Sequence, residues 1–355
     1  MFRVKAIQAN EGDALLVSYG SALKKRHILI DGGPSGSLET LLFVLECERQ
    51  TETLELEALV VTHYDLDHIQ GVIELLNNLP SWLIIRDIWF NGYHHLQPFD
   101  ILGPTEGDRL SALIRTKGLK WNASFCMQQN HREGPAIQQT THPVKLRDEL
   151  EVCVLSPDEA GLKALAANWQ NPKLPPPEQS LAPDDLLGRS DKWPPLPLST
   201  YRLDQFRSDR SVPNRSSIAL LLTFKGKRML LAADAWCDVI KNGLTKHLPN
   251  GEPIDLLKVS HHGSKGNTDR QLLNSLRCKK FLISTSGKGH NHPDHALIGR
   301  LVANHSNPTI YFNYKQGLSG KWHIKPFDWP SYVPQYPIGD TPYVEVELDP
   351  DSAST

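Results

Sequence analysis

Four side chains that can bind a divalent cation lie within six residues of one another: His63, Asp65, Asp67 and His68. They follow an apolar run typical of a buried strand and precede a helical pattern, so they lie where α/β proteins place their sites. Two imidazoles and two carboxylates would bind one or two divalent cations of the Zn or Mn kind. The alternative is a polar loop with a helix cap, but capping needs one carboxylate and no histidine.

This His-x-Asp-x-Asp-His pattern resembles the His-x-His-x-Asp-His signature of the metallo-β-lactamase fold, with Asp65 in place of the second histidine. The replacement makes it similar to the branch that includes the nuclease-like domain of the competence protein ComEC. The resemblance implies an α/β fold, an αββα sandwich of two mixed β-sheets with helices outside and metals at one edge. It implies a single domain, 1–355, with an insertion and Pro-rich loop around 82–213 and a C-terminal extension around 314–355.

The composition is that of a globular protein without a membrane helix. The chain has 355 residues, 39% hydrophobic and 22% charged, which is ordinary for a soluble globular protein. A net charge of −2 gives no overall field for nucleic acid, so local cations must hold an anionic substrate. No apolar run approaches the roughly 20 residues of a membrane helix, and the N-terminus reads as a strand rather than a signal peptide. Five scattered cysteines fit a reducing cytosol, so we expect a cytoplasmic protein without a membrane partner.

Strands are expected at 2–9 and 13–19, followed by a third that ends in Asp31 and two glycines. The resembled branch has a turn near the metal site between the first two strands. Here that match is partial, and a hairpin turn at Gly12 is the alternative. The resemblance makes Asp31 a residue that orients a metal histidine, whereas the alternative is a helix cap. A helix is expected at 37–49.

The middle of the chain is less regular. We expect a strand at 82–90, a helix at 105–117 and extended chain at 120–128 and 143–155. The loop histidines His94 and His95 are open to either a ligand role or an ordinary surface position.

Prolines concentrate between 172 and 213, too densely for regular structure. A loop this long is usually functional or partly disordered. It contains Arg202, Arg207 and Arg210, which either contact phosphate or are simply solvated. The ComEC-like branch has an Asn/Ser segment here, which makes Asn214 and Ser216 candidates for substrate contacts or ligand support; a strand-entry turn is the alternative.

Two later segments complete the resemblance. Asp234 closes an apolar strand; in the resembled family this acid bridges two metals, whereas the alternative is a cap for a helix at about 236–247. His261, His262 and Ser264 lie in a segment that resembles the Lys-x-x-His-His-Gly-Ser segment of the branch. Adjacent side chains leave a strand in opposite directions, so we choose His262 as the metal ligand. His261 and Ser264 would then support ligands or contact substrate.

A last segment, Asn291 and His292 before a proline, matches the substrate-facing Asn…His-Pro of the branch. His292 would protonate a leaving oxygen or bind phosphate, and Asn291 would contact substrate. A helix start is the alternative, and a helix is expected at 296–304. A strand is expected at 309–312 and a final one at 343–348, which would pack on an edge of the fold.

The resemblance thus implies a binuclear metallohydrolase with two divalent cations, Zn or Mn. The first cation would bind His63, Asp65 and Asp234, and the second Asp67, His68, Asp234 and His262. A hydroxide that bridges the cations would attack, oriented by Asp67. We expect a phosphodiesterase or nuclease acting on DNA, with phosphates met by basic residues that flank the motifs: Lys258, Lys265, Arg215 and Lys288. The alternatives are a hydrolase of smaller phosphodiesters, of the phosphorylcholine- or nucleotide-ester type, and a non-catalytic metal-loaded binding or sensor protein. Partner proteins of a larger system and the oligomeric state are left open.

Overall fold

The computed structural model describes residues 1–96, 105–126, 131–170, 191–203, 205–288 and 290–348. The strands are β1 (Phe2–Ile7), β2 (Leu15–Gly20), β3 (Lys25–Ile30), β4 (Leu54–Val60), β5 (Leu83–Ile85), β6 (Ile88–Trp89), β7 (Val144–Lys145), β8 (Glu151–Ser156), β9 (Ala219–Phe224), β10 (Lys227–Leu231), β11 (Leu256–Lys258), β12 (Lys280–Ile283), β13 (Thr309–Phe312), β14 (Val333–Gln335) and β15 (Tyr343–Glu347). The helices are α1 (Leu38–Glu48), α2 (Leu66–Asn77), α3 (Tyr93–Leu96), α4 (Glu106–Thr116), α5 (Glu159–Gln170), α6 (Leu198–Leu203), α7 (Val212–Arg215), α8 (Cys237–His247), α9 (Arg270–Ser275), α10 (His295–Asn304) and α11 (Gly317–Lys321), with 3-10 turns η1 (Ala123–Phe125), η2 (Arg147–Glu149) and η4 (His261–Gly263).

These strands form two mixed sheets. The first has the order β15-β1-β2-β3-β4-β5, with β6 also paired to β4. Its strands are antiparallel from β15 to β3 and parallel from β3 onward. The second has the order β14-β13-β12-β11-β10-β9-β8-β7, parallel from β14 to β10 and antiparallel beyond. The final strand β15 lies on an edge of the first sheet, as the sequence predicted.

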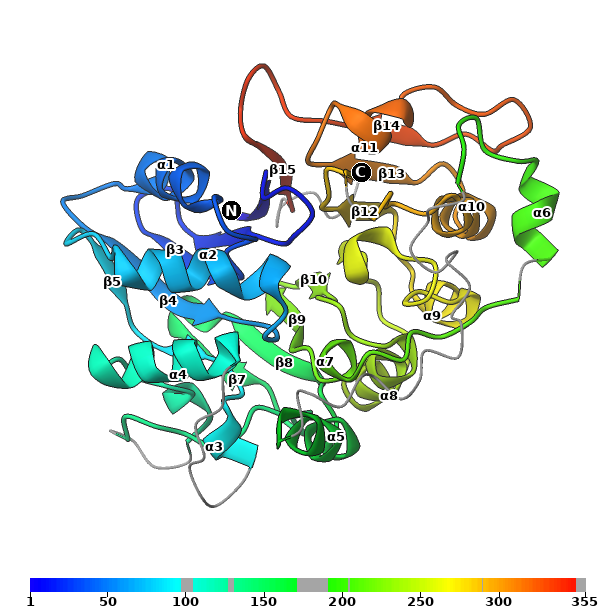
Figure 1. Cartoon of the computed structure of the whole chain (residues 1–355). Helices are drawn as coiled ribbons and strands as arrows, with labels where there is room; N and C mark the ends of the chain where they lie inside the picture. The colour runs from blue at the N-terminus through cyan, green and yellow to red at the C-terminus, as the bar shows by residue number, and fades with distance from the viewer. Residues whose placement is uncertain (97–104, 127–130, 171–190, 204, 289, 349–355) are drawn as a thin grey trace.

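Alternation along the strands shows how the layers stack. On β2, Leu16 packs with the helices α1, α2 and α4, whereas its neighbours Leu15 and Val17 face the second sheet. On β9, Leu221 packs with α8, α9 and α10, whereas Leu220 faces the first sheet. The core therefore has one layer between the sheets and one under each set of helices. In Figure 1, α1 and α2 lie beside the first sheet on the left, and α9 and α10 lie beside the second on the right. The predicted αββα sandwich is confirmed.

Several local expectations need correction. The predicted strand at 82–90 is divided into β5 and β6, and 120–126 contains η1 and an isolated bridge at Trp121 instead of a strand. The expectation of no regular structure in the Pro-rich stretch is wrong for α6 and α7. Pro213 lies in the first turn of α7, where the missing N–H of proline costs no hydrogen bond. Residues 171–190 of that stretch lie outside the described residues.

The fold brings the carboxyl ends of strands from both sheets to one edge. The N–H of Ile218, just before β9, donates to the carbonyl of Thr62, just after β4, at 3.0 Å. The helix α2 also packs tightly against the turn after β3, because a Cβ on Gly71 would lie 1.9 Å from the carbonyl oxygen of Gly32. Glycine is thus required where these two backbones cross. Among the described residues, no helix combines the length and apolar character needed to cross a membrane.

Candidate metal centre

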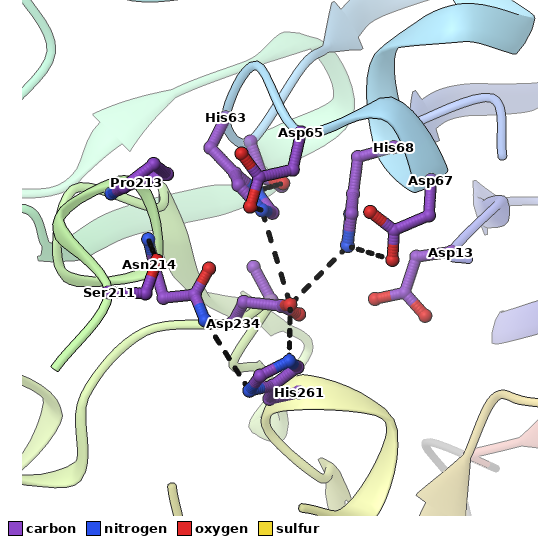
Figure 2. A network of polar contacts seen from close by, with 12 residues as sticks. Asp13, His63, Asp65, Asp67, His68, Ser211, Pro213, Asn214, Asp234 and His261 are labelled. Carbon is purple, nitrogen blue, oxygen red and sulfur yellow. Dashed lines mark hydrogen bonds and ion pairs between the residues drawn. The ribbon is translucent and has the colours of Figure 1, made fainter. Parts of the chain in front are cut away.

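Side chains from three strand ends converge at this edge. The loop after β4 and the first turn of α2 supply His63, Asp65, Asp67 and His68, and the turn after β10 supplies Asp234. The turn η4, after β11, supplies His261 and His262. Figure 2 shows His63, His68 and His261 directed toward the carboxylate of Asp234.

Four imidazoles present the same nitrogen to one carboxylate oxygen. The Nε2 atoms lie close to Oδ2 of Asp234, at 4.0 Å for His63, 3.5 Å for His68, 3.7 Å for His261 and 3.7 Å for His262. These side chains come from segments far apart in the sequence, so the convergence is a product of the fold. It gives Asp234 the central position that a bridging ligand would need.

The opposite nitrogen of two of these imidazoles is held by the first sheet. His68 Nδ1 lies 2.8 Å from Oδ2 of Asp31, which also accepts from the Thr62 hydroxyl at 2.8 Å. His63 Nδ1 lies 3.0 Å from that same hydroxyl. Asp31 therefore lies where the sequence predicted, behind a histidine of the cluster.

The histidines of η4 are held in the same way. His261 Nδ1 lies 3.0 Å from Oδ1 of Asn267, and His262 Nδ1 donates to the carbonyl of Ser284 at 3.0 Å. Histidines that bind metals generally bond through the other ring nitrogen, which fixes the tautomer and the ring orientation. All four rings have this arrangement.

Two further carboxylates complete the cluster. Asp67 Oδ2 lies 3.2 Å from Nε2 of His262 and 3.6 Å from Nε2 of His68, whereas Asp65 Oδ2 lies 3.5 Å from Nε2 of His63. Ligand atoms of His63, His68 and Asp234 lie within 4.8 Å of one another, as do those of Asp67, His68 and His262. The cluster thus offers two overlapping donor sets.

The electrostatics fit a cation. Burial alone would raise the pKa of Asp234, but the imidazoles of His68, His261 and His262 hold it well below its ordinary value. Burial alone would lower the pKa of the latter two histidines, but Asp234 and their other carboxylate neighbours raise it to about 10 for His261 and about 9 for His262. Positive charge therefore stabilises these buried carboxylates, and either protons on the histidines or a divalent cation can supply it.

Two buried atoms without a hydrogen-bond partner also favour a bound cation. His63 Nε2 and Asp234 Oδ1 are buried with no hydrogen-bond partner among the described residues. Buried polar atoms are costly without a partner, and a divalent cation would provide one. The donor set of imidazole nitrogens and carboxylate oxygens suits Zn or Mn.

Neither Asp234 nor Asp65 caps a helix with its side chain. The helix α8 begins at Cys237 with Trp236 as its N-cap residue, so Asp234 is not that cap. Asp65 does occupy the N-cap position of α2, but its side chain makes no capping hydrogen bond. The chain therefore keeps both carboxylates available to the cluster.

His261 and His262 do not point in opposite directions, as they would in an extended strand. The two residues instead lie in η4 with φ angles of 50° and 53°, and both rings reach Asp234 at 3.7 Å. His261 is therefore a candidate ligand as well as His262.

The predicted supporting residues lie in different places. Asn214 Nδ2 donates to Asp209 at 2.6 Å and lies 3.4 Å from His261 Nδ1, so it borders the cluster. Ser216 instead donates its hydroxyl to the carbonyl of Pro213 at 2.8 Å, at the end of α7. The hydroxyl of Ser264 accepts from the N–H of Gly266 at 3.3 Å.

The late His-Pro segment lies beside η4. The ring centroids of His292 and His261 are 5.7 Å apart. His292 is buried, its Nδ1 lies 3.7 Å from Asp294 Oδ1, and that nitrogen has no hydrogen-bond partner among the described residues. Burial lowers the pKa of His292. Asn291 is half-buried with a φ of 56°.

Several residues at the site were not predicted. Asp209 lies 3.5 Å from His261 Nδ1, and Asn267 accepts from the same nitrogen. Both approach from loops without a motif. Asp13 forms a buried pair behind His262 with Lys258, and the expectation that Lys258 meets phosphate is wrong because its side chain is 0% exposed. The turn that contains Asp13 did carry a partial signal, because the resemblance places it near the metals.

A second group, His94, His95 and Glu133, also has ligand atoms within 4.8 Å of one another. It suits a cation less well. The N–H of Gly92 donates to Nδ1 of His95 at 3.2 Å, which places the ring proton on Nε2, the nitrogen that faces Glu133. Burial and the neighbouring His94 lower the pKa of His95 to about 3, so its imidazole is neutral, and Glu133 is the one carboxylate of this group.

Comparison with known proteins supports the resemblance predicted from the signature. Residues 12–86 match the family model described as the metallo-beta-lactamase superfamily. This matched segment contains the loop after β4 and the start of α2, and the two-sheet fold agrees with the match.

Individual relatives are more distant. "ComE operon protein 3" of Bacillus subtilis (strain 168) is 30% identical over 131 residues, which are 34% of this chain and 16% of that protein. The chain thus matches about a sixth of that relative's length, which lends limited support to the ComEC-like resemblance. The metallo-beta-lactamase fold protein YhfI from Bacillus subtilis is 12% identical, and its superposition covers 89% of this chain and 98% of YhfI with a TM-score of 0.42. Tm1679, a metal-dependent hydrolase of the beta-lactamase superfamily, is 9% identical, and its superposition covers 98% of this chain and 99% of Tm1679 with a TM-score of 0.45.

Proposed function

We propose that this protein hydrolyses phosphodiesters with two divalent cations, Zn or Mn, and that DNA is its substrate class. One observation carries the proposal: four imidazoles, each held by a partner at Nδ1, present Nε2 to the shared carboxylate of Asp234. When bound, the cations would activate water and polarise a phosphoryl oxygen.

The residues divide into two ligand sets that share Asp234. The first cation would be held by His63, Asp65, Asp234 and, in addition to the set predicted from sequence, His261. The second would be held by Asp67, His68, Asp234 and His262. With His261, the first set has four candidate ligands, as many as the second.

Accessibility indicates which of these groups meet substrate. The side chains of Asp65 and Asp67 are 37% and 36% exposed, and that of His261 is 25% exposed, whereas Asp234 and His68 are buried. Asp67 is therefore a ligand that can also orient the attacking water. Asn214 is buried, and its Oδ1 has no hydrogen-bond partner among the described residues, so it borders the cluster without being one of its exposed groups.

The leaving oxygen needs a proton, and His292 is the candidate donor. Because burial lowers its pKa, the free imidazole is neutral at pH 7. A phosphoryl anion bound beside it would raise that pKa and allow it to donate. Its neighbour Asp294, 3.7 Å from Nδ1, would stabilise the protonated ring.

Local positive charge supports an anionic substrate. Arg207 and Arg210 are exposed and flank Asp209, which contacts His261. The N–H of Asp209 donates to the carbonyl of Gly266 at 3.0 Å, which holds this segment against the loop after η4. Arginines so placed can neutralise phosphates on either side of a scissile bond. The ComEC-like resemblance favours DNA over smaller esters.

The test uses metal-free protein reconstituted with Mn or Zn. Plasmid DNA, single-stranded DNA and bis-para-nitrophenyl phosphate are incubated with it, and we expect at least one phosphodiester to be cleaved. Turnover of a β-lactam or lactone with none of these would overturn the phosphodiester assignment. Cation binding without turnover of any substrate would favour the metal-loaded sensor.

A further inference from the structure

A buried ion pair lies directly behind the candidate cation ligands. Lys258, the last residue of β11, has a side chain that is 0% exposed, and its Nζ donates to Oδ2 of Asp13, which is 1% exposed. Nζ also lies 3.4 Å from the carbonyl oxygen of Ala233, the residue before Asp234. Burying two charges is costly, so a pair at this location calls for an explanation.

The other oxygen of Asp13 faces the cation site. Its Oδ1 lies 3.5 Å from Nδ1 of His262 and has no hydrogen-bond partner among the described residues. Ligand atoms of Asp13, Asp31 and His68 also lie within 4.8 Å of one another. One oxygen of this carboxylate is thus taken by a lysine, and the other is directed at a candidate ligand.

The backbone prevents Asp13 from withdrawing. A Cβ on Gly12 would lie 1.7 Å from the carbonyl oxygen of Asp67, so this turn is packed tightly against the metal loop. On its other side, the hydroxyl of Ser284 donates to the carbonyl of Gly12 at 3.3 Å. The carbonyl of Ser284 in turn accepts from His262. Asp13, Asp67 and His262 therefore have a fixed spacing.

We propose that Asp13 and Lys258 are positioning residues for the cation held by Asp67, His68 and His262. His262 donates its Nδ1 proton to the carbonyl of Ser284, and the negative charge of Asp13, 3.5 Å from Nδ1, favours the tautomer that keeps the proton there and presents Nε2 to the cation. Lys258 pairs with the same carboxylate and keeps it from becoming a cation ligand itself. The inference rests on the cation site of the proposed function and does not depend on its substrate.

The charge arrangement predicts opposite effects for the two single variants. In Asp13→Asn, the ammonium of Lys258 loses its counter-charge and repels the cation, and His262 loses the negative charge beside its Nδ1. Cation affinity should fall about tenfold or more, the usual effect of removing such a partner. In Lys258→Met, the freed carboxylate attracts the cation, so affinity should rise. The double variant should lie between them.

Affinity for Mn is measured without substrate, by equilibrium dialysis at pH 7.5, with circular dichroism as the check on folding. Lys5→Met is the matched control, because Lys5 of β1 and Glu48 of α1 form another buried pair, at 2.5 Å. That variant should lower stability and leave Mn affinity unchanged. If Lys258→Met does not fold, Lys258→Gln removes the charge and keeps a hydrogen-bond donor, and its thermal stabilisation by Mn gives the same comparison.

A purely structural pair would weaken Mn binding in both single variants, and that result would overturn the proposal. Unchanged affinity in Asp13→Asn would do so too. The outcomes are separable from those of the proposed function. A protein that binds Mn with these opposite effects but cleaves no phosphodiester would retain the positioning pair and lose the substrate assignment, whereas a wild-type protein that binds no divalent cation would refute both.

Discussion

Two buried clusters of charged side chains lie at opposite ends of β3, and they differ in how their charges are matched. At the start of the strand, Glu48 accepts from Arg3 at 2.8 Å, Lys5 at 2.5 Å and Lys25 at 3.2 Å. Burial alone would raise the pKa of Glu48, but these cations lower it to about 2. The partners of Glu48 are complete within the chain, since both of its oxygens are paired with basic side chains.

The cluster beyond the end of β3 is not complete in this sense. Asp234 is surrounded by four Nε2 atoms at 3.5–4.0 Å, yet its Oδ1 and the Nε2 of His63 have no hydrogen-bond partner among the described residues. Basic side chains balance Glu48 directly, whereas imidazoles balance a carboxylate only while protonated. The comparison teaches that burial and charge alone do not mark a site; convergent unpaired ligand atoms do.

The largest expected effect is a loss of activity when the cluster around Asp234 is changed. Asp234→Asn keeps the shape of the side chain and removes the negative charge that two cations would share. Activity should fall by several orders of magnitude, because nucleophile formation and placement are both lost. Metal content should fall as well, whereas folding should survive because it rests on the sheets. Phosphodiesterase rates and metal analysis check this; metal content and rates near wild type would remove Asp234 from the centre.

The reciprocal variant is Glu48→Gln. It leaves Arg3, Lys5 and Lys25 without their shared carboxylate, and breaking a buried pair costs about 3 kcal/mol. We expect a lower free energy of unfolding with metal content and turnover unchanged, measured by denaturant titration and the same assays. A matching loss of metal would show that the two ends of the strand are coupled and would undo the comparison.

The clusters should also respond to pH in different ranges. The raised pKa values of His261 and His262, about 10 and 9, contribute stability to the cation-free protein that is fully present below the unfolded value near 6.5. It is lost as the pH rises through 9 to 10. The lowered pKa of Glu48 contributes stability above about 4.5, which is lost as the pH falls toward 2.

Thermal unfolding of chelator-treated protein between pH 7 and 10 tests the first range. The melting temperature should drop toward pH 10, and saturating cation should reduce the drop, because it replaces the protons on the histidines. A drop of equal size with and without cation would mean that the histidines are not its source.

The smallest effect concerns substrate choice. Replacing Arg207 and Arg210 with alanine should weaken binding of long DNA and reduce its salt dependence, since fewer phosphates are neutralised. Hydrolysis of bis-para-nitrophenyl phosphate should change little. The control replaces Lys145 and Lys163, whose side chains are 61% and 75% exposed, and should bind DNA as wild type does. Equal losses on both substrates would assign the arginines to the fold.

The sequence by itself determined the elements whose signals are local. An apolar strand followed by closely spaced ligands identified His63 to His68, and an acid that closes a strand identified Asp234. The alternating and helical patterns predicted most strands and the helices α1, α4, α8 and α10, because those patterns reflect which faces are buried. The proline content wrongly excluded helices from the Pro-rich stretch, because the first turn of a helix tolerates proline, as at Pro213 in α7.

Only the tertiary structure decided how distant segments combine. The direction of both η4 histidines depends on left-handed backbone angles that no spacing reveals. The supporting contacts of Asp209 and Asn267 arise where two loops meet, and the pair of Asp13 and Lys258 joins residues 245 positions apart. A sequence states which side chains can bind or pair, but burial and partner distance, which set their charges, exist only once the sheets have packed.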